Sequence, residues 1–207
     1  MAKSDGIVFV IDDEPSVRKA LARLLNSAGF RPETFASAND FLQRPHYDGP
    51  GCLVLDVHMP GLSGLELQDA MASAGYYLPI VFISGKSDIP ESVRGMKAGA
   101  VDFLKKPFSD TELLAAINVS LKKDLEARAA RAERAKIDER VQALTPRERE
   151  VLSFMVTGML NKQIAFELGI TEKTVKVHRA RVMEKMQAGS VAELVRLAEK
   201  ADIAPPS

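Results

Sequence analysis

Strand-like segments alternate with helix-length stretches throughout the first half of the chain, and this alternation most constrains the fold. The strand-like segments lie near residues 7–11, 31–35, 52–56, 79–84 and 101–104. Most of them are nearly continuous apolar runs, which are typical of strands buried on both faces of a parallel sheet. The stretches between them carry apolar residues at helical spacing, such as Val17, Leu21, Leu24 and Leu25. We predict a doubly wound parallel α/β sheet of five strands with helices on both faces.

Side chains that can carry charge or form hydrogen bonds stand where four of these segments end. They are Asp12 and Asp13, Asp56, Ser84 and Lys106. Because function collects at the carboxyl ends of the strands in such sheets, we expect these five side chains to converge. Hard carboxylate oxygens suit Mg²⁺, and a carboxylate beside such an ion can attack phosphorus. Lys106 and Ser84 would then hold the phosphoryl oxygens.

Single members of this set also fit less specific interpretations. The Asp12-Asp13 pair alone fits a helix-capping turn, which is a common feature after a strand. Cys52 lies in an apolar run, where an inert buried thiol is the ordinary outcome. The ring of His58 could be considered as a metal ligand, but a lone loop histidine usually has no such role. The complete set of five is much more specific than any of its parts.

The formal net charge of zero hides an asymmetry along the 207 residues. Lys and Arg minus Asp and Glu give −4 for residues 1–121 (11 against 15), +2 for 122–140 (7 against 5) and +2 for 141–207 (10 against 8). Any argument for nucleic-acid binding must therefore be local. No apolar stretch approaches the roughly 20 residues that span a bilayer, and the N-terminus lacks the apolar core of a secretory signal. With one cysteine, we expect a cytoplasmic protein without membrane association.

Residues 122–140 are predicted to form a long helical linker between a domain at 1–121 and a domain at 141–207. Twelve of these 19 residues are charged, and no Gly or Pro interrupts them. Because the apolar stripe is weak, a solvated spacer that extends the preceding helix is favoured. A dimerising coiled coil stays open, although its apolar seam is thin. We expect the preceding helix to open at Asp110, which is a good N-cap residue.

The last segment has the outline of a four-helix, helix-turn-helix domain. Thr145-Pro146-Arg147-Glu148 forms a capping box with proline at the first helical position. Residues 161–168 make a short helix, Gly169 the turn, and Thr171 caps a longer helix to about Met186. Another helix spans about 191–200. The longer helix carries five cations, Lys173, Lys176, Arg179, Arg181 and Lys185. Such a helix could be only a solvated face, but this context favours a recognition helix in the major groove.

Several motifs resemble the receiver domain of two-component response regulators. They are Val10-Ile11-Asp12-Asp13-Glu14, Leu55-Asp56-Val57-His58-Met59-Pro60-Gly61, Ile83-Ser84-Gly85 and Leu104-Lys105-Lys106-Pro107-Phe108. The resemblance implies a flavodoxin-like (βα)₅ fold with Asp56 as phosphoacceptor from a sensor histidine kinase. It implies Mg²⁺, for which Mn²⁺ can substitute, held by Asp13, Asp56 and the main-chain carbonyl of His58, with Asp12 acting mainly through water.

The same resemblance implies a cis Lys106-Pro107 peptide bond and a switch that couples Ser84 to Phe103 on the last strand. A purely structural core role for Phe103 is the alternative interpretation. Ser84 stands where threonine is commoner in the family, but the hydroxyl is kept. A charge change at Asp56 would bias the surface near Phe103 between two states.

The rear motifs, from Leu144-Thr145-Pro146-Arg147-Glu148 to Thr174-Val175-Lys176-Val177-His178, resemble the LuxR-type helix-turn-helix domain. The whole chain is thus similar to the FixJ/NarL family of response regulators. The resemblance makes Lys176 and Val177 the best candidates for base contacts. Thr174, His178 and Arg179 would lie at the DNA backbone or groove edge, and Lys173 and Arg181 are also expected to bind DNA. Ala180 departs from members that carry a cation at that position.

We therefore expect a transcription regulator, not an enzyme, whose partners are a sensor histidine kinase, promoter DNA, RNA polymerase and, on phosphorylation, a second copy of the chain. Two other classes stay open. A Mg²⁺-dependent phosphohydrolase also uses an Asp nucleophile, but no Asp-x-Asp motif at the nucleophile or inserted cap is present. A constitutive DNA binder with a vestigial receiver is the second, although all five site residues are retained.

Overall fold

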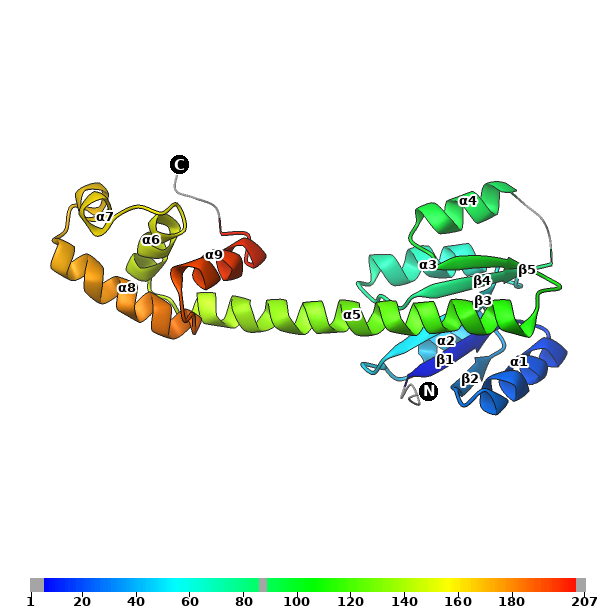
Figure 1. Cartoon of the computed structure of the whole chain (residues 1–207). Helices are drawn as coiled ribbons and strands as arrows, with labels where there is room; N and C mark the ends of the chain where they lie inside the picture. Colours follow the sequence, from blue (N-terminus) through cyan, green and yellow to red (C-terminus); the bar gives the residue numbers. More distant parts are fainter. Residues whose placement is uncertain (1–5, 86–88, 204–207) are drawn as a thin grey trace. The chain divides into compact units, whose positions relative to one another are not determined.

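The computed structural model describes residues 6–85 and 89–203 of the chain. The chain divides into two compact units, Met1–Arg128 and Ala129–Ser207. The boundary lies within the segment predicted to be the linker, inside one continuous helix, α5 (Asp110–Gln142). The elements of each unit can be followed in Figure 1.

The first unit contains the predicted five-stranded parallel sheet, with strand order β2-β1-β3-β4-β5. The strands are β1 (Ile7–Ile11), β2 (Arg31–Phe35), β3 (Gly51–Asp56), β4 (Ile80–Ser84) and β5 (Asp102–Lys105). All four strand pairs are parallel. Strands β1, β3 and β4 are buried along their whole length, which explains their continuous apolar sequences.

Helices cover both faces of this sheet. They are α1 (Pro15–Ser27), α2 (Ala38–Gln43), α3 (Gly64–Ser73), α4 (Ile89–Lys97) and the first part of α5. Alternate residues of a strand face opposite sides, so Phe9 packs with α2 and α3 while Val10 packs with α1 and α5. This double core anchors the strands whose carboxyl ends carry the predicted site.

The start of α5 differs in detail from the prediction. The helix begins at Asp110, but Ser109 is the residue that caps it. The Ser109 hydroxyl accepts a hydrogen bond from the Glu112 backbone N–H at 3.2 Å, and the Glu112 carboxylate accepts one from the Ser109 N–H at 2.8 Å. The sequence offers two adjacent capping residues, and the reciprocal bond with Glu112 selects the serine.

The second unit contains the predicted four helices, α6 (Pro146–Met155), α7 (Asn161–Leu168), α8 (Glu172–Met186) and α9 (Val191–Lys200), together with the end of α5. Its core includes Ile137 of α5, Leu152, Ile164, Val175 and Leu194. Gly169 takes the left-handed conformation at the α7–α8 turn, with φ 61°. None of the described helices of the chain combines the length and the apolar character that crossing a membrane requires.

Candidate functional site

The carboxyl edge of the sheet brings together two buried carboxylates and one ammonium group. Asp12 at the end of β1 is 0% exposed, and Asp56 at the end of β3 is 5% exposed. The Lys106 Nζ lies 2.7 Å from Asp12 Oδ2 and 2.7 Å from Asp56 Oδ1, and donates a hydrogen bond to each. Three strand ends thus meet at one cation, as the parallel topology requires.

Backbone groups fix the direction of both carboxylates. The Glu14 N–H donates to Asp12 Oδ1 at 2.8 Å, and the His58 N–H donates to Asp56 Oδ2 at 2.7 Å. Each carboxylate therefore has one oxygen held by its own loop and the other by Lys106. This arrangement orients Asp56 before any ligand arrives.

Helix α3 begins so close to Asp56 that its first residue, Gly64, has no room for a side chain. A Cβ on Gly64 would lie 2.3 Å from the Asp56 carbonyl oxygen, so any larger residue would force the helix away from the strand. The Gly64 N–H donates to the Val57 carbonyl at 3.0 Å. These two contacts hold the loop between β3 and α3 close to the end of β3 that carries Asp56.

The acidic residues at this edge carry more negative charge than the single ammonium group of Lys106 can balance. Burial raises the pKa of Asp56, and the neighbouring Asp12 adds to the rise, while Lys106 and the His58 N–H oppose it. For Lys106, burial lowers the pKa, but hydrogen bonds to Asp12 and Asp56 outweigh burial and raise it. One ammonium therefore serves two buried carboxylates, and the exposed Asp13 beside them adds a third negative charge.

The remaining predicted receiver residues also lie near this edge. Ser84 is fully buried at the end of β4. Phe103 on β5 is partly buried, with its ring centroid 6.0 Å from that of Phe82. The Lys106-Pro107 peptide bond is cis. The His58 Nε2 lies 3.2 Å from a Glu91 carboxylate oxygen of α4, so the ring is engaged with an acid rather than turned towards Asp56.

The residues fit a hard divalent cation better than a soft one. Oxygen donors with excess negative charge, partly open to solvent at Asp13, suit Mg²⁺, which keeps several of its waters. No three His, Cys, Asp or Glu side chains form a metal-holding group among the residues that the structure describes. The predicted ligand set, in which the His58 carbonyl joins the carboxylates of Asp12, Asp13 and Asp56, stays a prediction.

The predicted recognition helix α8 exposes most of its cations. Lys173, Lys176 and Arg181 are exposed, as is Val177, whereas Val175, Val182 and Met186 are buried beneath them. Thr171 caps the helix by accepting from the Thr174 N–H at 3.2 Å. The exposed face of α8 therefore offers positive charges and one apolar side chain, Val177, for contact with a groove of DNA.

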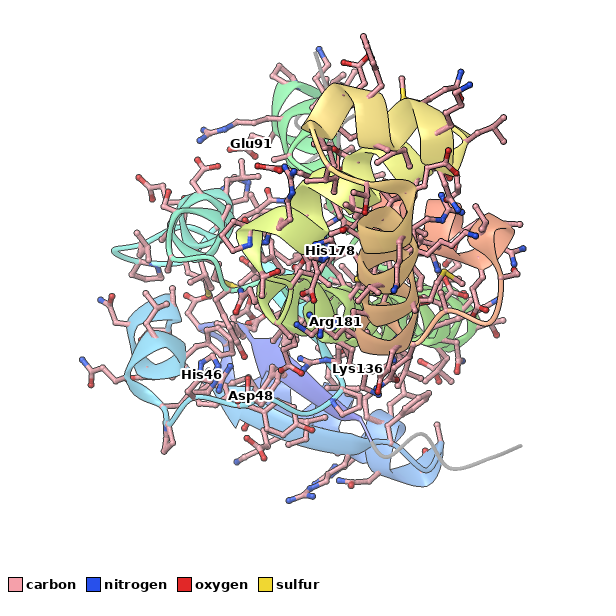
Figure 2. The ribbon with its side chains drawn as sticks, turned by 90° about the vertical axis from the view of Figure 1, so that its left-hand side faces the viewer. His46, Asp48, Glu91, Lys136, His178 and Arg181 are labelled. Atoms are coloured by element: carbon pink, nitrogen blue, oxygen red, sulfur yellow. The ribbon has the colours of Figure 1, made fainter. Side chains whose placement is uncertain are left out.

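Three residues of α8 are less free than their types indicate. The Thr174 hydroxyl is 2.8 Å from that of Thr171 and belongs to the cap. His178 is partly buried, and its Nδ1 is buried without a hydrogen-bond partner among the described residues. Figure 2 shows His178 and Arg181 at different heights along this helix. The Arg179 side chain lines a surface cavity together with Leu160, which precedes α7, and Val191, the first residue of α9.

Lys185 has a structural partner that sequence reasoning missed. Its Nζ lies 2.6 Å from Glu148 Oε2 and donates also to the Ala143 carbonyl at 3.1 Å. Glu148 was predicted only as part of a capping box, which it does complete by accepting from the Thr145 N–H at 2.9 Å. Spacing along the chain gives no signal for a pair 37 residues apart.

Comparison with known proteins identifies the class that this fold and site define. Residues 8–118 match the response regulator receiver domain family, and residues 142–198 match the luxR family of bacterial regulatory proteins. Together these matches cover most of the chain. The chain therefore belongs to the two-component response regulators that join a receiver to a LuxR-type DNA-binding domain, which is a family of transcription regulators.

Individual relatives share this organisation over nearly the whole chain. The chain is 46% identical to nodulation protein W of Bradyrhizobium diazoefficiens over 96% of its length and 87% of that protein. It is 44% identical to the transcriptional regulatory protein FixJ of Azorhizobium caulinodans, over 96% of this chain and 94% of that protein. The solved structure of response regulator StyR matches with a TM-score of 0.84 and 49% identity, covering 94% of this chain and 98% of that one.

Proposed function

We propose that Asp56 accepts a phosphoryl group from a sensor histidine kinase and that this modification controls DNA binding by the second unit. The single observation that carries the proposal is the position of Asp56, a buried carboxylate with one oxygen on the His58 N–H and the other on Lys106. An Asp56 oxygen forms a bond to phosphorus while the phosphorus–nitrogen bond of the kinase's phosphohistidine breaks. The electron pair returns to the imidazole, and an acyl phosphate is left on Asp56.

Each neighbouring residue has a defined part in this proposal. Lys106 already bridges Asp12 and Asp56, so it can follow the new negative charge onto a phosphoryl oxygen. Ser84, buried at the end of the next strand, would donate its hydroxyl to another oxygen. Asp13, Asp56 and the His58 carbonyl would hold Mg²⁺, with Asp12 acting through water. The ion supplies the positive charge that three carboxylates and one lysine lack.

The output would follow from a change at the surface near Phe103. Phe103 is only partly buried against Phe82, so its ring can respond to a shift of Ser84 on the adjacent strand. We propose that phosphorylation promotes a homodimer in the cytoplasm, in which two α8 helices bind half-sites one helical turn apart. Lys176 and Val177 would contact bases, and Lys173, Thr174, His178, Arg179 and Arg181 would lie at the backbone or groove edge. RNA polymerase would be the final partner.

Incubation with a small-molecule phosphodonor and Mg²⁺ tests the first step. Intact-mass measurement should show one added phosphoryl group on the wild type and none on Asp56→Asn, while Asp40→Asn, an exposed change on α2, should still be labelled. Binding of promoter DNA should then increase with phosphodonor for the wild type and Asp40→Asn only. Equal DNA binding by the wild type with and without phosphodonor would favour the constitutive DNA binder.

A further inference from the structure

Asp124 on α5 is a charged side chain buried far from the carboxyl edge of the sheet. It is 1% exposed. Its Oδ2 accepts hydrogen bonds from the Gly51 N–H at 2.9 Å and from Arg128 Nε at 2.7 Å. Its Oδ1 is buried and has no hydrogen-bond partner within the described part of the chain. A carboxylate is costly to bury, so its presence among the buried and mostly apolar residues of α5 requires an explanation.

Arg128 extends this contact to the segment that leads into β3. Its guanidinium bonds to Asp124 and also donates to the Asp48 carbonyl. Asp48 in turn accepts from His46 at 2.9 Å, and Figure 2 shows these two side chains in the loop after α2. Asp124 and Arg128, one helical turn apart, thus hold both ends of residues 48–51. We call Asp124, Arg128, Asp48 and Gly51 the α5 clamp.

The α5 clamp and the proposed phosphorylation site lie at opposite ends of one strand. Gly51 is the first residue of β3 and Asp56 is the last. The strand is paired with β1 on one side and β4 on the other. A strand that is hydrogen-bonded on both sides moves as a unit, so a displacement at Asp56 is transmitted to Gly51 more readily than it is absorbed between them.

The α5 clamp also contains the last buried residue of α5 in the first unit. From Leu125 to Lys136 no residue of the helix is buried, and the next buried residue is Ile137, which belongs to the core of the second unit. The polar groups of the α5 clamp therefore decide how firmly the end of this helix in the first unit is held.

We propose that the α5 clamp positions the helix that leaves the first unit, and that phosphorylation of Asp56 reaches the DNA-binding unit only when this clamp is intact. The inference rests on the proposed function, because it names the path by which that site acts. Asp124 and Arg128 touch no reacting atom and are positioning residues. The competing explanation is that the buried pair only stabilises the first unit.

The single cysteine of the chain provides a direct reporter. Cys52 is adjacent to Gly51 and 0% exposed. Burial raises the pKa of its thiol, and the nearby Asp124 raises it further. Labelling by a thiol reagent therefore requires local opening next to the α5 clamp. The rate of labelling, corrected for the thiolate fraction from its pH dependence in each variant, reports on the clamp without reference to phosphorylation.

Asp124→Asn tests the proposal, with Glu126→Gln as its matched control. Both changes turn an acid into its amide on the same helix, and Glu126 also pairs with a cation four residues away, at 3.8 Å from Lys122, but is exposed. Asp124→Asn should keep phosphodonor labelling of Asp56 and should react at Cys52 about tenfold faster. The gain in affinity on phosphorylation, for a DNA fragment selected by the wild type, should fall about tenfold. Glu126→Gln should match the wild type throughout.

Arg128→Lys provides a second variant in case Asp124→Asn does not fold. Lysine keeps the charge but loses the guanidinium that bridges Asp124 and Asp48, so the same two effects should appear at smaller size. Faster Cys52 labelling with an undiminished response to phosphodonor would overturn the proposal and leave a stabilising role. If the wild type itself is not labelled at Asp56, the proposed function fails, and that failure is separate because the Cys52 rates still report on the α5 clamp.

Discussion

Two buried acids in this molecule each form an ion pair with a lysine. One pair lies at the proposed phosphorylation site, and the other joins α6 to α8. In the first unit Lys106 lies 2.7 Å from Asp56, and in the second unit Lys185 lies 2.6 Å from Glu148. Burial raises the pKa of Asp56, whereas the hydrogen bond from Lys185, with help from Thr145, lowers the pKa of Glu148 to about 2. The distances are equivalent, so the difference comes from burial, which is the largest cause of the raised pKa of Asp56, and from the other groups that share each lysine.

The number of carboxylates for each cation separates the two pairs. Lys106 divides its charge between Asp56 and Asp12, so neither acid is fully compensated. Glu148 has Lys185 to itself and in addition accepts from the backbone of its capping box. Removing one partner of a satisfied buried pair destabilises a fold, while an undercompensated pair leaves room for an added cation and an added phosphoryl group.

The largest expected effect is on the satisfied pair. Glu148→Gln removes the charge from Lys185, and we expect the second unit to lose about 2 kcal/mol of unfolding free energy. An acid with a lowered folded pKa contributes stability above its unfolded pKa, so this contribution is present above about pH 4.5 and is lost as the pH falls towards about 2. Hydrogen exchange of peptides from α6 and α8, measured at pH 7, checks the loss.

Glu150→Gln is the matched control for this prediction. Glu150 lies on the same helix and pairs with Arg147, but is exposed, so its loss should change the exchange rates little. Equal effects of the two substitutions would contradict a stabilising contribution that is specific to the buried pair.

At Asp56 we expect a substitution to increase the stability of the first unit, in contrast to the loss expected at Glu148. Asp56→Asn should stabilise the first unit, by about 1 kcal/mol, because it removes a buried charge that its surroundings do not fully compensate. An acid with a raised folded pKa contributes stability that is present below its unfolded pKa and is lost as the pH rises through the folded value, so the gain should shrink on acidification. Urea unfolding followed by tyrosine fluorescence isolates this unit, because the chain has no Trp and its three tyrosines are Tyr47, Tyr76 and Tyr77.

Adding Mg²⁺ provides a further test of the prediction for Asp56→Asn. The ion should stabilise the wild type more than Asp56→Asn, because it supplies the missing charge only where the carboxylate is present. A destabilised Asp56→Asn protein at pH 7 would contradict the account of an undercompensated acid.

The contrast also shows what the sequence could predict. The five strands, the order of helices and the five residues at the carboxyl edge follow from apolar runs and from the rule that parallel strands end together. The Glu148 capping box was equally visible because its partners are three residues apart. Local patterns thus located both acids of the two pairs.

The partners of those acids were partly beyond such reasoning. Lys106 could be assigned because it ends a strand, but Lys185 sits on a helix whose cations all looked available to DNA. Nothing in the spacing distinguishes Lys185 from Arg181, since only the packing of α6 against α8 brings Lys185 to Glu148. Asp124 was missed for the same reason, because its partner Gly51 is 73 residues away. Long-range polar contacts on charged helices leave no periodic signal.

Arg181 and Lys185 provide the smallest and most selective test. Arg181 is exposed, so Arg181→Gln should weaken binding to promoter DNA about fivefold and reduce the slope of log affinity against log salt by about 1. The charge of Lys185 is compensated by Glu148, so Lys185→Gln should leave the salt slope unchanged while lowering the stability of the second unit. Fluorescence anisotropy with labelled DNA, across a salt series and at a temperature where both variants are folded, distinguishes the two residues. A salt slope reduced by the same amount in both variants would place Lys185 at the DNA and would weaken its assignment as the partner of Glu148.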